Sequence, residues 1–447
     1  MSQSPLFPLP ESDVPPPSSP TSPEHARVLR PNRQQLQWTP RDLDAALAQD
    51  HPARAIWDML ERLDLTPFYA SVRAFLDGPG RPATDPRVLL ALWLLATTEG
   101  IGSARHLARL CDEHDAYRWL CGGVPVNYHM LADFRVAQQA ALDDLMTQIV
   151  AVLMAAGAVT LERVAQDGMR VRASAGAASF RRKDTLKRCL AAAREQVERL
   201  ALDRTHPDPG VSKRQQAARE RGARERVARV EQALACLPEM QNTKEAAQKK
   251  RYAKAEQEQV AEARTSVTDP EARVMKMPDG GFRPSYNVQF ATDGAHGVMV
   301  GVAVTTAGAD AGQAVPVVDQ IEQRTQWRPD NYLVDGGFAT RGDITELEQR
   351  GITVYAPVRL PKNKPEAERY GAHDGDSPEV AAWRERMGTA EAKVVYRQRG
   401  AIAEWTNAQV RQHGVSQFNV RGLANVTTVM LLVAVAHNLM RWLSLPA

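Results

Sequence analysis

Cysteine is scarce in this sequence, which has four cysteines among 447 residues. They are Cys111, Cys121, Cys189 and Cys236. No two of them form a C-x-x-C pair, so the sequence indicates neither a zinc site nor a disulfide framework. Unpaired thiols fit a reducing compartment, and we therefore expect a cytoplasmic protein.

Long apolar runs are also rare. The N-terminus is rich in Ser and Pro and lacks the basic and then apolar pattern of a signal peptide. The one long run, residues 426–440, is interrupted by Thr427, Thr428, His437 and Asn438. It is too short and too polar to span a bilayer, so we expect a buried helix there and no membrane partner.

A strong excess of either charge is missing as well, with 56 Lys and Arg against 53 Asp and Glu. The distribution is less even, because residues 181–264 contain 21 Lys and Arg and 13 Asp and Glu. A basic segment beside an acidic remainder suggests a module that binds a polyanion. A solvated charged helix gives the same count, and the count alone favours that simpler interpretation.

The length predicts several modules, because one domain usually holds roughly 100 to 200 residues. Residues 1–37 are a Pro/Ser-rich tract without an apolar period, which predicts a disordered arm. We expect a helical domain at 38–158 and a basic helical insertion at 179–265. The segments 159–178 and 266–447 should together form an α/β domain.

Apolar residues recur at helical spacing through the first of these domains. The spacing predicts amphipathic helices at 53–63 and 68–76, a helix from Pro86 that is apolar nearly all round, and a helix at 126–155. A helix that is apolar on every side belongs in the centre of a small bundle.

A glycine turn at 99–103 follows the apolar helix, and Ser103 can cap a second helix that carries Arg105. This is the outline of a helix-turn-helix, whose second helix could place Arg105 in a major groove of DNA. Any pair of antiparallel helices in a bundle gives the same outline, so both interpretations stay open.

The first strand of the α/β domain is predicted at 164–168, an apolar run that carries Asp167 and ends on a glycine. Residues 169–173 then alternate apolar and basic, as expected of an exposed strand end that presents Arg170 and Arg172.

The chain next enters a long helix-forming segment, which a Pro- and Gly-rich break at 206–210 divides in two. This pattern predicts an antiparallel helical hairpin, and the basic excess lies within it. Such an arm can lie along DNA, with Arg181, Arg182 and Lys183 at its start as candidate contacts with phosphate groups.

Alternating apolar residues resume at 286–292 and 298–304, two runs joined by an Asp-Gly-containing loop, which predicts a β-hairpin. The elements after it are predicted in the order helix, strand, helix, strand, at 311–325, 331–338, 341–349 and 352–356. The whole order is that of a mixed α/β sheet of the ribonuclease H-like kind, interrupted after its first strand. In such a sheet the first and fourth strands are neighbours.

Two aspartates end strands that this order makes neighbours. Asp167 precedes Gly168, and Asp335 precedes Gly336 and Gly337. Each alone fits an ordinary Asp-Gly turn, but two such residues on adjacent strands predict carboxylates that converge at one edge of the sheet.

A third carboxylate is expected from a helix packed over that edge. Residues 396–407 predict such a helix, with Glu404 one helical face-repeat from Arg397 and Asn407. A glutamate on a helix usually faces solvent, so Glu404 becomes a candidate only through the residues around it.

These residues resemble bacterial insertion-sequence DDE transposases, which have an N-terminal helical transposase domain and a ribonuclease H-like core. The resemblance covers nearly the whole chain after the N-terminal arm. The matching motifs lie in both domains, at 80–87, 117–123, 132–135, 166–168, 280–287 and 335–338, and at Tyr396, Arg399 and Glu404.

The resemblance implies that Asp167, Asp335 and Glu404 form the acidic triad of the family and bind its metal ions. Tyr396 and Arg399 match the Tyr-x-x-Arg…Glu signature, which implies that they hold the DNA backbone near the scissile phosphate.

The signature departs from its commonest form in one respect. That form leaves three residues between Arg and Glu, whereas four lie between Arg399 and Glu404. Arg411 is the nearest match to the trailing basic residue, and with Arg397 it is a further candidate contact with DNA.

Cleavage and transfer of a phosphodiester explain why three carboxylates are expected. In this in-line displacement, two Mg²⁺ ions roughly 3.5 to 4 Å apart activate the attacking oxygen and stabilise the leaving one. Mg²⁺ prefers oxygen ligands, so a few carboxylates and substrate phosphates suffice, and Mn²⁺ could replace it. The resemblance implies cleavage at the ends of a mobile element, followed by attack of the freed 3′-hydroxyl on target DNA.

The expected partner is therefore double-stranded DNA at the nucleoid, both the terminal inverted repeats of the element and the target. A homodimer or a larger assembly would pair two ends. Two alternatives stay open. An inactive transposase descendant would only bind DNA, although its keeping all three acidic residues argues against this, and a ribonuclease H-like nuclease would cleave DNA without joining strands.

Overall fold

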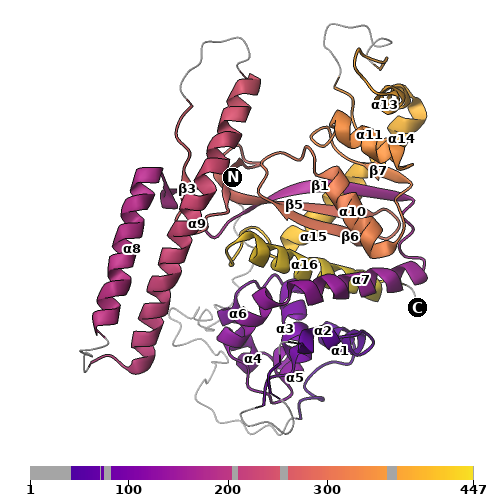
Figure 1. Ribbon diagram of the computed structural model, residues 1–447. Coiled ribbons are helices and arrows are strands. Elements are labelled where there is room, and N and C mark those ends of the chain that lie inside the picture. Colours follow the sequence, from indigo (N-terminus) through magenta and orange to yellow (C-terminus); the bar gives the residue numbers. More distant parts are fainter. Residues whose placement is uncertain are drawn as a thin grey trace, which may run out of the picture. The chain divides into compact units, whose positions relative to one another are not determined.

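The computed structural model describes residues 42–70, 72–74, 82–203, 210–251, 260–359 and 370–445. The described helices and strands belong to one compact unit, Leu43–Ala447 (Figure 1). Three features of the sequence lie outside the described residues: the arm at 1–37, the start of the first family motif at 80–81, and the break at 206–209.

Helices make up the described N-terminal region. They are Pro52–Glu61 (α1), Thr66–Tyr69 (α2), Pro86–Thr98 (α3), Ala104–Glu113 (α4), Asp115–Cys121 (α5), Tyr128–Ala137 (α6) and Gln139–Ala155 (α7). The helix predicted at 68–76 is wrong at Ala70 and at 72–74, which are not helical, while 71, 75 and 76 lie outside the described residues. The helix predicted at 126–155 is two helices, because Gln138, with φ −108° and ψ 28°, leaves the helical conformation between them.

Helix α3 is the central helix of this bundle, as predicted, and eleven of its 13 residues are buried. Asp85 caps its start by accepting a hydrogen bond from the backbone N of Arg87 (2.8 Å). Pro86 follows, at a position where a missing N–H leaves no hydrogen bond unmade. Trp93 donates from Nε1 to the carbonyl oxygen of Leu131 (3.0 Å), which joins α3 to α6.

The α/β domain contains a mixed six-stranded sheet. Its strands are Arg163–Arg172 (β1), Arg273–Lys276 (β4), Phe282–Asp293 (β5), Met299–Thr305 (β6), Asn331–Leu333 (β7) and Thr353–Tyr355 (β8). The order across the sheet is β6-β5-β1-β7-β8, and β4 pairs with the first part of β5. Helix α10 (Ala314–Thr325) connects β6 to β7, and α11 (Arg341–Gln349) connects β7 to β8.

Strand β1 is antiparallel to β5 and parallel to β7, so the first and fourth predicted strands are neighbours, as expected. The prediction that β1 ends at Gly168 is wrong. Its pairing with β5 runs from Val164 to Arg172, so Gly168 lies within a strand and Asp167 is not at the strand's end. The long partner strand β5 extends β1 past the glycine, which the local sequence does not reveal.

Amide side chains close part of the outer edge of β6. Gln320 of α10 accepts a hydrogen bond from Val302 N (2.7 Å) and donates one to Val302 O (3.0 Å). Asn438 makes the same two contacts with Met299, at 2.9 and 2.8 Å. Because these side chains satisfy the outward backbone groups, this part of the edge is not open to pairing with another strand.

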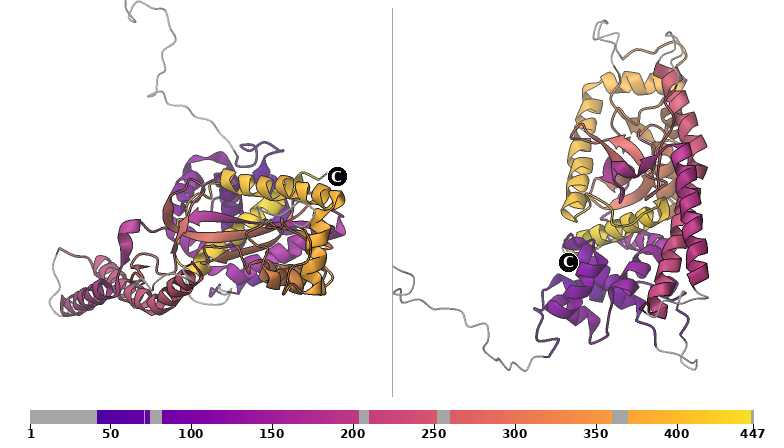
Figure 2. Two further views of the ribbon diagram at one scale, coloured as in Figure 1. Left: turned by 90° about the horizontal axis from the view of Figure 1, so that it is seen from above. Right: turned by 90° about the vertical axis from the view of Figure 1, so that its left-hand side faces the viewer.

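A helical hairpin interrupts the sheet after β1. Its elements are Phe180–Arg181 (β2), Lys183–Asp203 (α8), Lys213–Arg251 (α9) and Thr265–Ser266 (β3). Strand β2 pairs with β3 at the base, and α8 and α9 pack side by side along their length (Figure 2). A small apolar core between them includes Leu186, Val230, Ala233 and Leu237.

Helices follow β8 to the C-terminal end of the described chain. They are Pro378–Gly388 (α13), Ala390–Arg399 (α14), the π-helical turn Gly400–Glu404 (η2), Trp405–Gln412 (α15) and Leu423–Leu443 (α16). By length and composition α16 could cross a membrane, but 67% of its most apolar window is buried within the protein. It is the buried helix that the sequence predicts at 426–440.

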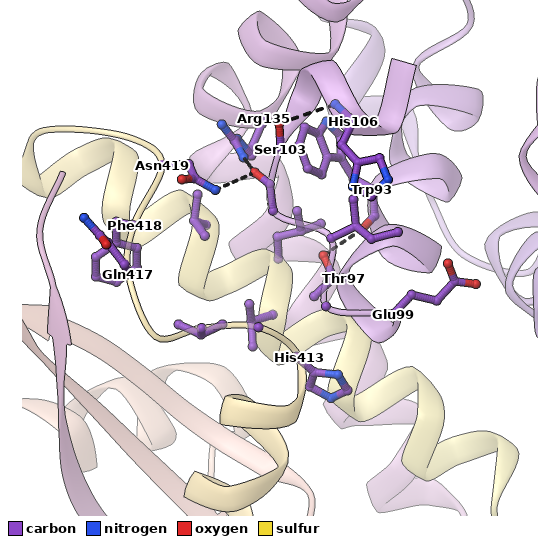
Figure 3. Close-up of a pocket in the computed structure, with 18 residues that line it drawn as sticks. Trp93, Thr97, Glu99, Ser103, His106, Arg135, His413, Gln417, Phe418 and Asn419 are labelled. Atoms are coloured by element: carbon purple, nitrogen blue, oxygen red, sulfur yellow. Dashed lines mark hydrogen bonds between the residues drawn. The ribbon is translucent and has the colours of Figure 1, made fainter. Parts of the chain in front are cut away.

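The turn between α3 and α4 touches the loop that follows α15. A Cβ atom on Gly414 would lie only 2.5 Å from the carbonyl oxygen of Gly100. Arg135 and Asn419 both donate hydrogen bonds to Gly102 O, at 2.5 and 3.1 Å. A pocket of about 470 Å³ lies beside this contact (Figure 3). The helical domain and the end of α15 are therefore joined by close backbone packing.

Replacement of Gly414 by alanine tests this junction. Gly414 has a φ of +75°, and such a conformation costs other residues about 1–3 kcal/mol, to which the contact with Gly100 adds. We expect Gly414→Ala to lower the free energy of unfolding by at least that amount in urea titrations. Gly222→Ala, in an open position on α9, should be neutral or stabilising by about 1 kcal/mol. Equal stability of the two variants would contradict the close packing.

Candidate active site

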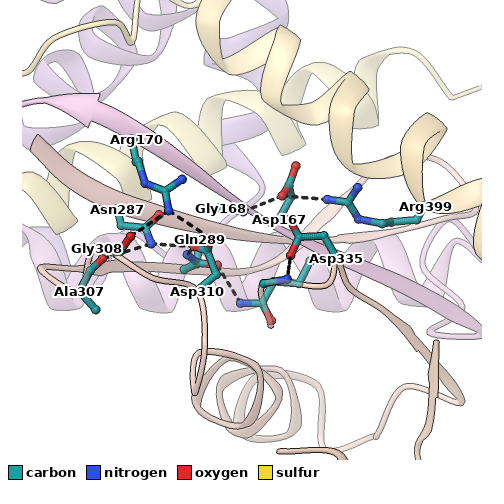
Figure 4. A network of polar contacts seen from close by, with 12 residues as sticks. Asp167, Gly168, Arg170, Asn287, Gln289, Ala307, Gly308, Asp310, Asp335 and Arg399 are labelled. Atoms are coloured by element: carbon teal, nitrogen blue, oxygen red, sulfur yellow. Dashed lines mark hydrogen bonds and ion pairs between the residues drawn. The ribbon is translucent and has the colours of Figure 1, made fainter. Parts of the chain in front are cut away.

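Two aspartates lie at the same level at one edge of the sheet (Figure 4). Ala165 of β1 pairs with Leu333 of β7 in a parallel ladder. Asp167, still within β1, and Asp335, just past the end of β7, each lie two residues further along, so the parallel register brings them to the same level of the sheet. The negative charge of Asp335 raises the pKa of Asp167, which is a direct electrostatic consequence of this proximity.

The carboxylate of Asp167 is held by a basic and an amide side chain. Arg399 Nη2 lies 2.9 Å from Asp167 Oδ1, and Asn407 donates from Nδ2 to Oδ2 (2.9 Å). The backbone N of Gly168 donates to Oδ1 (3.0 Å). The Asp167 and Arg399 side chains are 18% and 13% exposed, so this is a largely buried ion pair.

Burial raises the pKa of Asp167, because the protein replaces the water that would stabilise the ionised form. The Arg399 guanidinium and the Gly168 N–H oppose this shift, while the charges of Asp335 and Asp310 add to it. Burial outweighs these groups and the pKa is raised overall, but Arg399 is the group that lowers it most.

Tyr396 belongs to the same electrostatic environment. Burial raises the pKa of its hydroxyl, Arg399 lowers it, and the charges of Asp335 and Asp167 raise it. The structure thus brings together four of the predicted residues, Asp167, Asp335, Tyr396 and Arg399.

A π-helical turn determines which side chains of the last segment face Asp167. Residues eight apart in an α-helix are turned by about 80°, whereas residues seven apart are turned by only about 20°. The turn at Gly400–Glu404 takes up one extra residue, so Arg399 and Asn407 face the same carboxylate. The expectation that Arg397 shares this face is wrong, because the extra residue rotates it away, and Arg397 is exposed.

Glu404 lies at the end of this π-turn and is exposed. Asn407, three residues later, contacts Asp167, so Glu404 is on a neighbouring part of the same helical surface. Within the described residues Glu404 has no hydrogen bond or ion pair with Asp167 or Asp335. No three His, Cys, Asp or Glu side chains in the described part of the chain are close enough to hold a metal ion by themselves.

The other predicted basic residues are distributed over several elements. Arg172 and Arg411 are exposed, and Arg105 is exposed on α4 with its guanidinium 5.2 Å from the centre of the Tyr128 ring. At the base of the hairpin, Arg181 is half-buried, Lys183 is exposed, and Arg182 is exposed with its Nε 3.8 Å from Glu262. Arg170 instead forms an ion pair with Asp310 (3.3 Å).

Asp310 is the acidic residue of this region that the sequence analysis missed. It lies in the loop after β6, and its charge raises the pKa of Asp167. The directions of the strands indicate its position, because β5 reverses the chain between β1 and β6. Strands β1, β6 and β7 therefore run in the same direction, and the loop after β6 reaches the edge where Asp167 and Asp335 lie.

Comparison with known families gives two matches. A family model described as a transposase domain (DUF772) matches residues 41–137, and one described as a transposase DDE domain matches residues 253–439. Neither the curated proteins nor the solved structures contain a match.

Substitution of Arg399 tests its control over the charge of Asp167. Arg399→Gln removes the main group that lowers the pKa of Asp167, so that pKa should rise further. At pH values above the pKa of Asp167, we expect a loss of about 1–3 kcal/mol in the free energy of unfolding. The loss should shrink as the pH falls and Asp167 becomes protonated in both proteins. Urea titrations over a pH series measure it.

Arg397→Gln is the matched control, since this exposed arginine lies two residues earlier on the same helix. It should leave the pH dependence of stability unchanged. A loss in Arg399→Gln that stays constant with pH would show that the guanidinium does not act through Asp167.

Proposed function

The chain belongs to the insertion-sequence transposases with a DDE domain, and we propose that it cuts the ends of its element and transfers them to target DNA. Asp167, Asp335 and Glu404 form the catalytic triad in this proposal. The observation that carries it is the pair of carboxylates, Asp167 and Asp335, at one level of two adjacent parallel strands. The strand order β6-β5-β1-β7-β8, in which only β5 is reversed, supports a ribonuclease H-like core.

Oxygen donors at this edge suit a hard divalent cation such as Mg²⁺ or Mn²⁺. Asp167 and Asp335 offer carboxylates, and the buried Asn407 Oδ1 has no hydrogen-bond partner in the described part of the chain. Asp167 already attracts a positive group, Arg399. Glu404 and DNA phosphates would complete the ligands. When bound, the metal would stabilise charge on the attacking and leaving oxygens of the phosphodiester.

The protein's own groups orient the DNA strand in this proposal. Arg399 is held at the sheet edge by Asp167, and a guanidinium in that position can also bind a phosphate by two parallel hydrogen bonds. Tyr396 lies beside it, and burial keeps its hydroxyl protonated, so it can donate to a phosphate oxygen. These contacts would fix the scissile phosphate relative to the two aspartates.

In this proposal, the DNA outside the cleavage site binds to the basic surfaces of the protein. The hairpin of α8 and α9 presents basic side chains along its length, among them Arg194 and Arg199, which are 59% and 69% exposed. Contacts of this type with phosphates give affinity without sequence preference. Arg105 on α4 is a candidate for base contacts if the α3–α4 pair acts as a helix-turn-helix.

Two other functions are less well supported. An inactive descendant that only binds DNA would have no need to retain an ionised carboxylate within a strand, at the cost of burying its charge. A nuclease that cleaves without joining would use the same acidic residues. Products of the reaction distinguish it, because only a transposase gives joined strands.

Substitution of the acidic residues tests catalysis. Asp335→Ala, Asp167→Asn and Glu404→Gln should each lower Mg²⁺-dependent nicking and strand transfer by at least about 100-fold, because each loses a ligand of a metal that contributes several kcal/mol. Glu385→Gln, at an exposed position of α13, is the control and should retain activity. Undiminished cleavage by Asp335→Ala would refute the proposed triad.

The basic hairpin can be tested through the salt dependence of DNA binding. Arg182→Gln together with Lys183→Gln should reduce the slope of log affinity against log salt by about 0.9 for each phosphate that the protein no longer neutralises. The reduction should be the same for DNA of any sequence. Arg328→Gln, which removes an exposed arginine outside the hairpin, should leave the slope unchanged, and an unchanged slope in the double variant would exclude phosphate binding at the base of the hairpin.

A further inference from the structure

We propose that Asp310 is a positioning residue, whose carboxylate holds the Arg170 guanidinium in place to bind a DNA phosphate on the opposite face of β1 from Asp167. The proposal rests on the proposed function for its DNA substrate. It concerns two residues outside the catalytic triad, one of which the sequence predicted only as a general contact with DNA.

The Asp310 carboxylate is fixed by three side chains. Asn287 Nδ2 and Gln289 Nε2, both on β5, donate to Oδ1 at 2.7 and 2.9 Å. Arg170 Nη2, on β1, lies 3.3 Å from Oδ2. The carboxylate is only 12% exposed. Oδ1 is held by the two amides of β5 and Oδ2 faces Arg170, so the carboxylate is set to orient this guanidinium (Figure 4).

The glycine after Asp167 makes room for Asp310. A Cβ atom on Gly168 would overlap Asp310 Oδ1, so any other residue at position 168 would displace this carboxylate. The glycine inside β1, which a turn does not require, is therefore explained by the approach of Asp310.

A polar network anchors Asp310 to the sheet. Gln166 donates from Nε2 to Gln289 Oε1 (3.0 Å), and Tyr332 donates from its hydroxyl to Gln166 Oε1 (2.6 Å). Gln166, Gln289 and Asn287 are fully buried. The bonds from Tyr332 to Gln166 and from Gln166 to Gln289 define a single geometry for the Gln289 amide, so Gln289 fixes the position of Asp310 and, through it, that of Arg170.

A charged residue at position 310 is electrostatically unfavourable, because other acidic groups lie nearby. It adds a third negative group near Asp167 and Asp335 and raises the pKa of Asp167. A neutral side chain would avoid this repulsion and still accept a hydrogen bond. A carboxylate is favoured where a guanidinium must be held, and Arg170 is the guanidinium that it contacts.

Arg170 has donors left for a ligand. Its contacts with Gly308 O (3.0 Å) and Asp310 Oδ2 both use Nη2. Neither Nε nor Nη1 has a hydrogen-bond partner among the residues that the structure describes, and the side chain is 25% exposed. Arg170 follows Asp167 by three residues on β1, so the two side chains leave the strand on opposite faces. Asp310, which contacts Arg170, also lies close enough to Asp167 to raise its pKa, so the free donors of Arg170 lie across β1 from Asp167, where a phosphate further along the DNA could bind.

Positioning of Arg170 and simple charge repulsion predict opposite effects of an Asp310 substitution on DNA affinity, which gives a sharp test. Removing a negative charge ordinarily strengthens binding to DNA. If Asp310 positions Arg170, Asp310→Asn should instead weaken binding to a double-stranded DNA of random sequence about 5- to 10-fold, measured without divalent metal. Arg170→Gln should weaken it about 10-fold and lower the salt slope by about 0.9.

The double variant decides between positioning and a structural effect. In the Arg170→Gln background, Asp310→Asn should weaken binding no further, because the residue it positions is gone. Asp319→Asn, which removes one of the three acidic partners of Arg350 (2.5 Å) elsewhere in the domain, is the matched control and should not weaken binding. Stronger binding by Asp310→Asn, or an equal loss in both backgrounds, would overturn the proposal.

Arg170→Lys gives a second measurement if Asp310→Asn fails to fold in thermal unfolding. It keeps the charge but not the planar fork that Asp310 holds, so it should lose most of the affinity that Arg170→Gln loses, and wild-type affinity would overturn the proposal.

The triad is tested separately by the cleavage assay. If the binding assays show that Asp310 positions Arg170 but the wild type does not cleave DNA, only the proposed function is refuted. If the wild type cleaves DNA but Asp310 does not position Arg170, only this inference is refuted.

Discussion

The site depends on keeping one carboxylate ionised inside a β-sheet. Asp167 lies within β1, where burial disfavours its charge. Arg399 and Asn407 compensate by contacting one oxygen each, and both come from the chain's last quarter. A charge buried without such partners would be strongly destabilising. Asp167 can therefore be buried in β1 only because α14, the π-turn and α15 pack against that strand. The contacts that hold these elements together are also the contacts that form the site.

The order of the strands and the position of Asp335 could be predicted from sequence, because both follow from the pattern of apolar residues along whole strands. Apolar alternation indicated the order of the main strands, and that order made β1 and β7 neighbours. Asp335 could be found because it directly follows an apolar strand. The pairing of Asp167 with Arg399 was not predicted, because it joins residues more than two hundred positions apart that no local pattern connects.

The failures have a common physical cause, since each involves a local signal overruled by a distant contact. Gly168 resembled the end of a strand, but pairing with β5 carries β1 through it, and its missing Cβ admits Asp310. Arg397 has the right helical spacing from Glu404 only in a uniform α-helix. Asp310 lies in a loop without a motif, and its place becomes evident only from the directions of three strands.

The π-turn has a consequence for how sequences of this kind diverge. It absorbs one residue between Arg399 and Glu404 without rotating Arg399 away from Asn407. A relative with three intervening residues would reach the same arrangement with an uninterrupted α-helix. The signature can therefore have three or four residues between Arg and Glu. A single-codon insertion or deletion at this point can be neutral, whereas the same change elsewhere in the helix would turn the side chains of the site away.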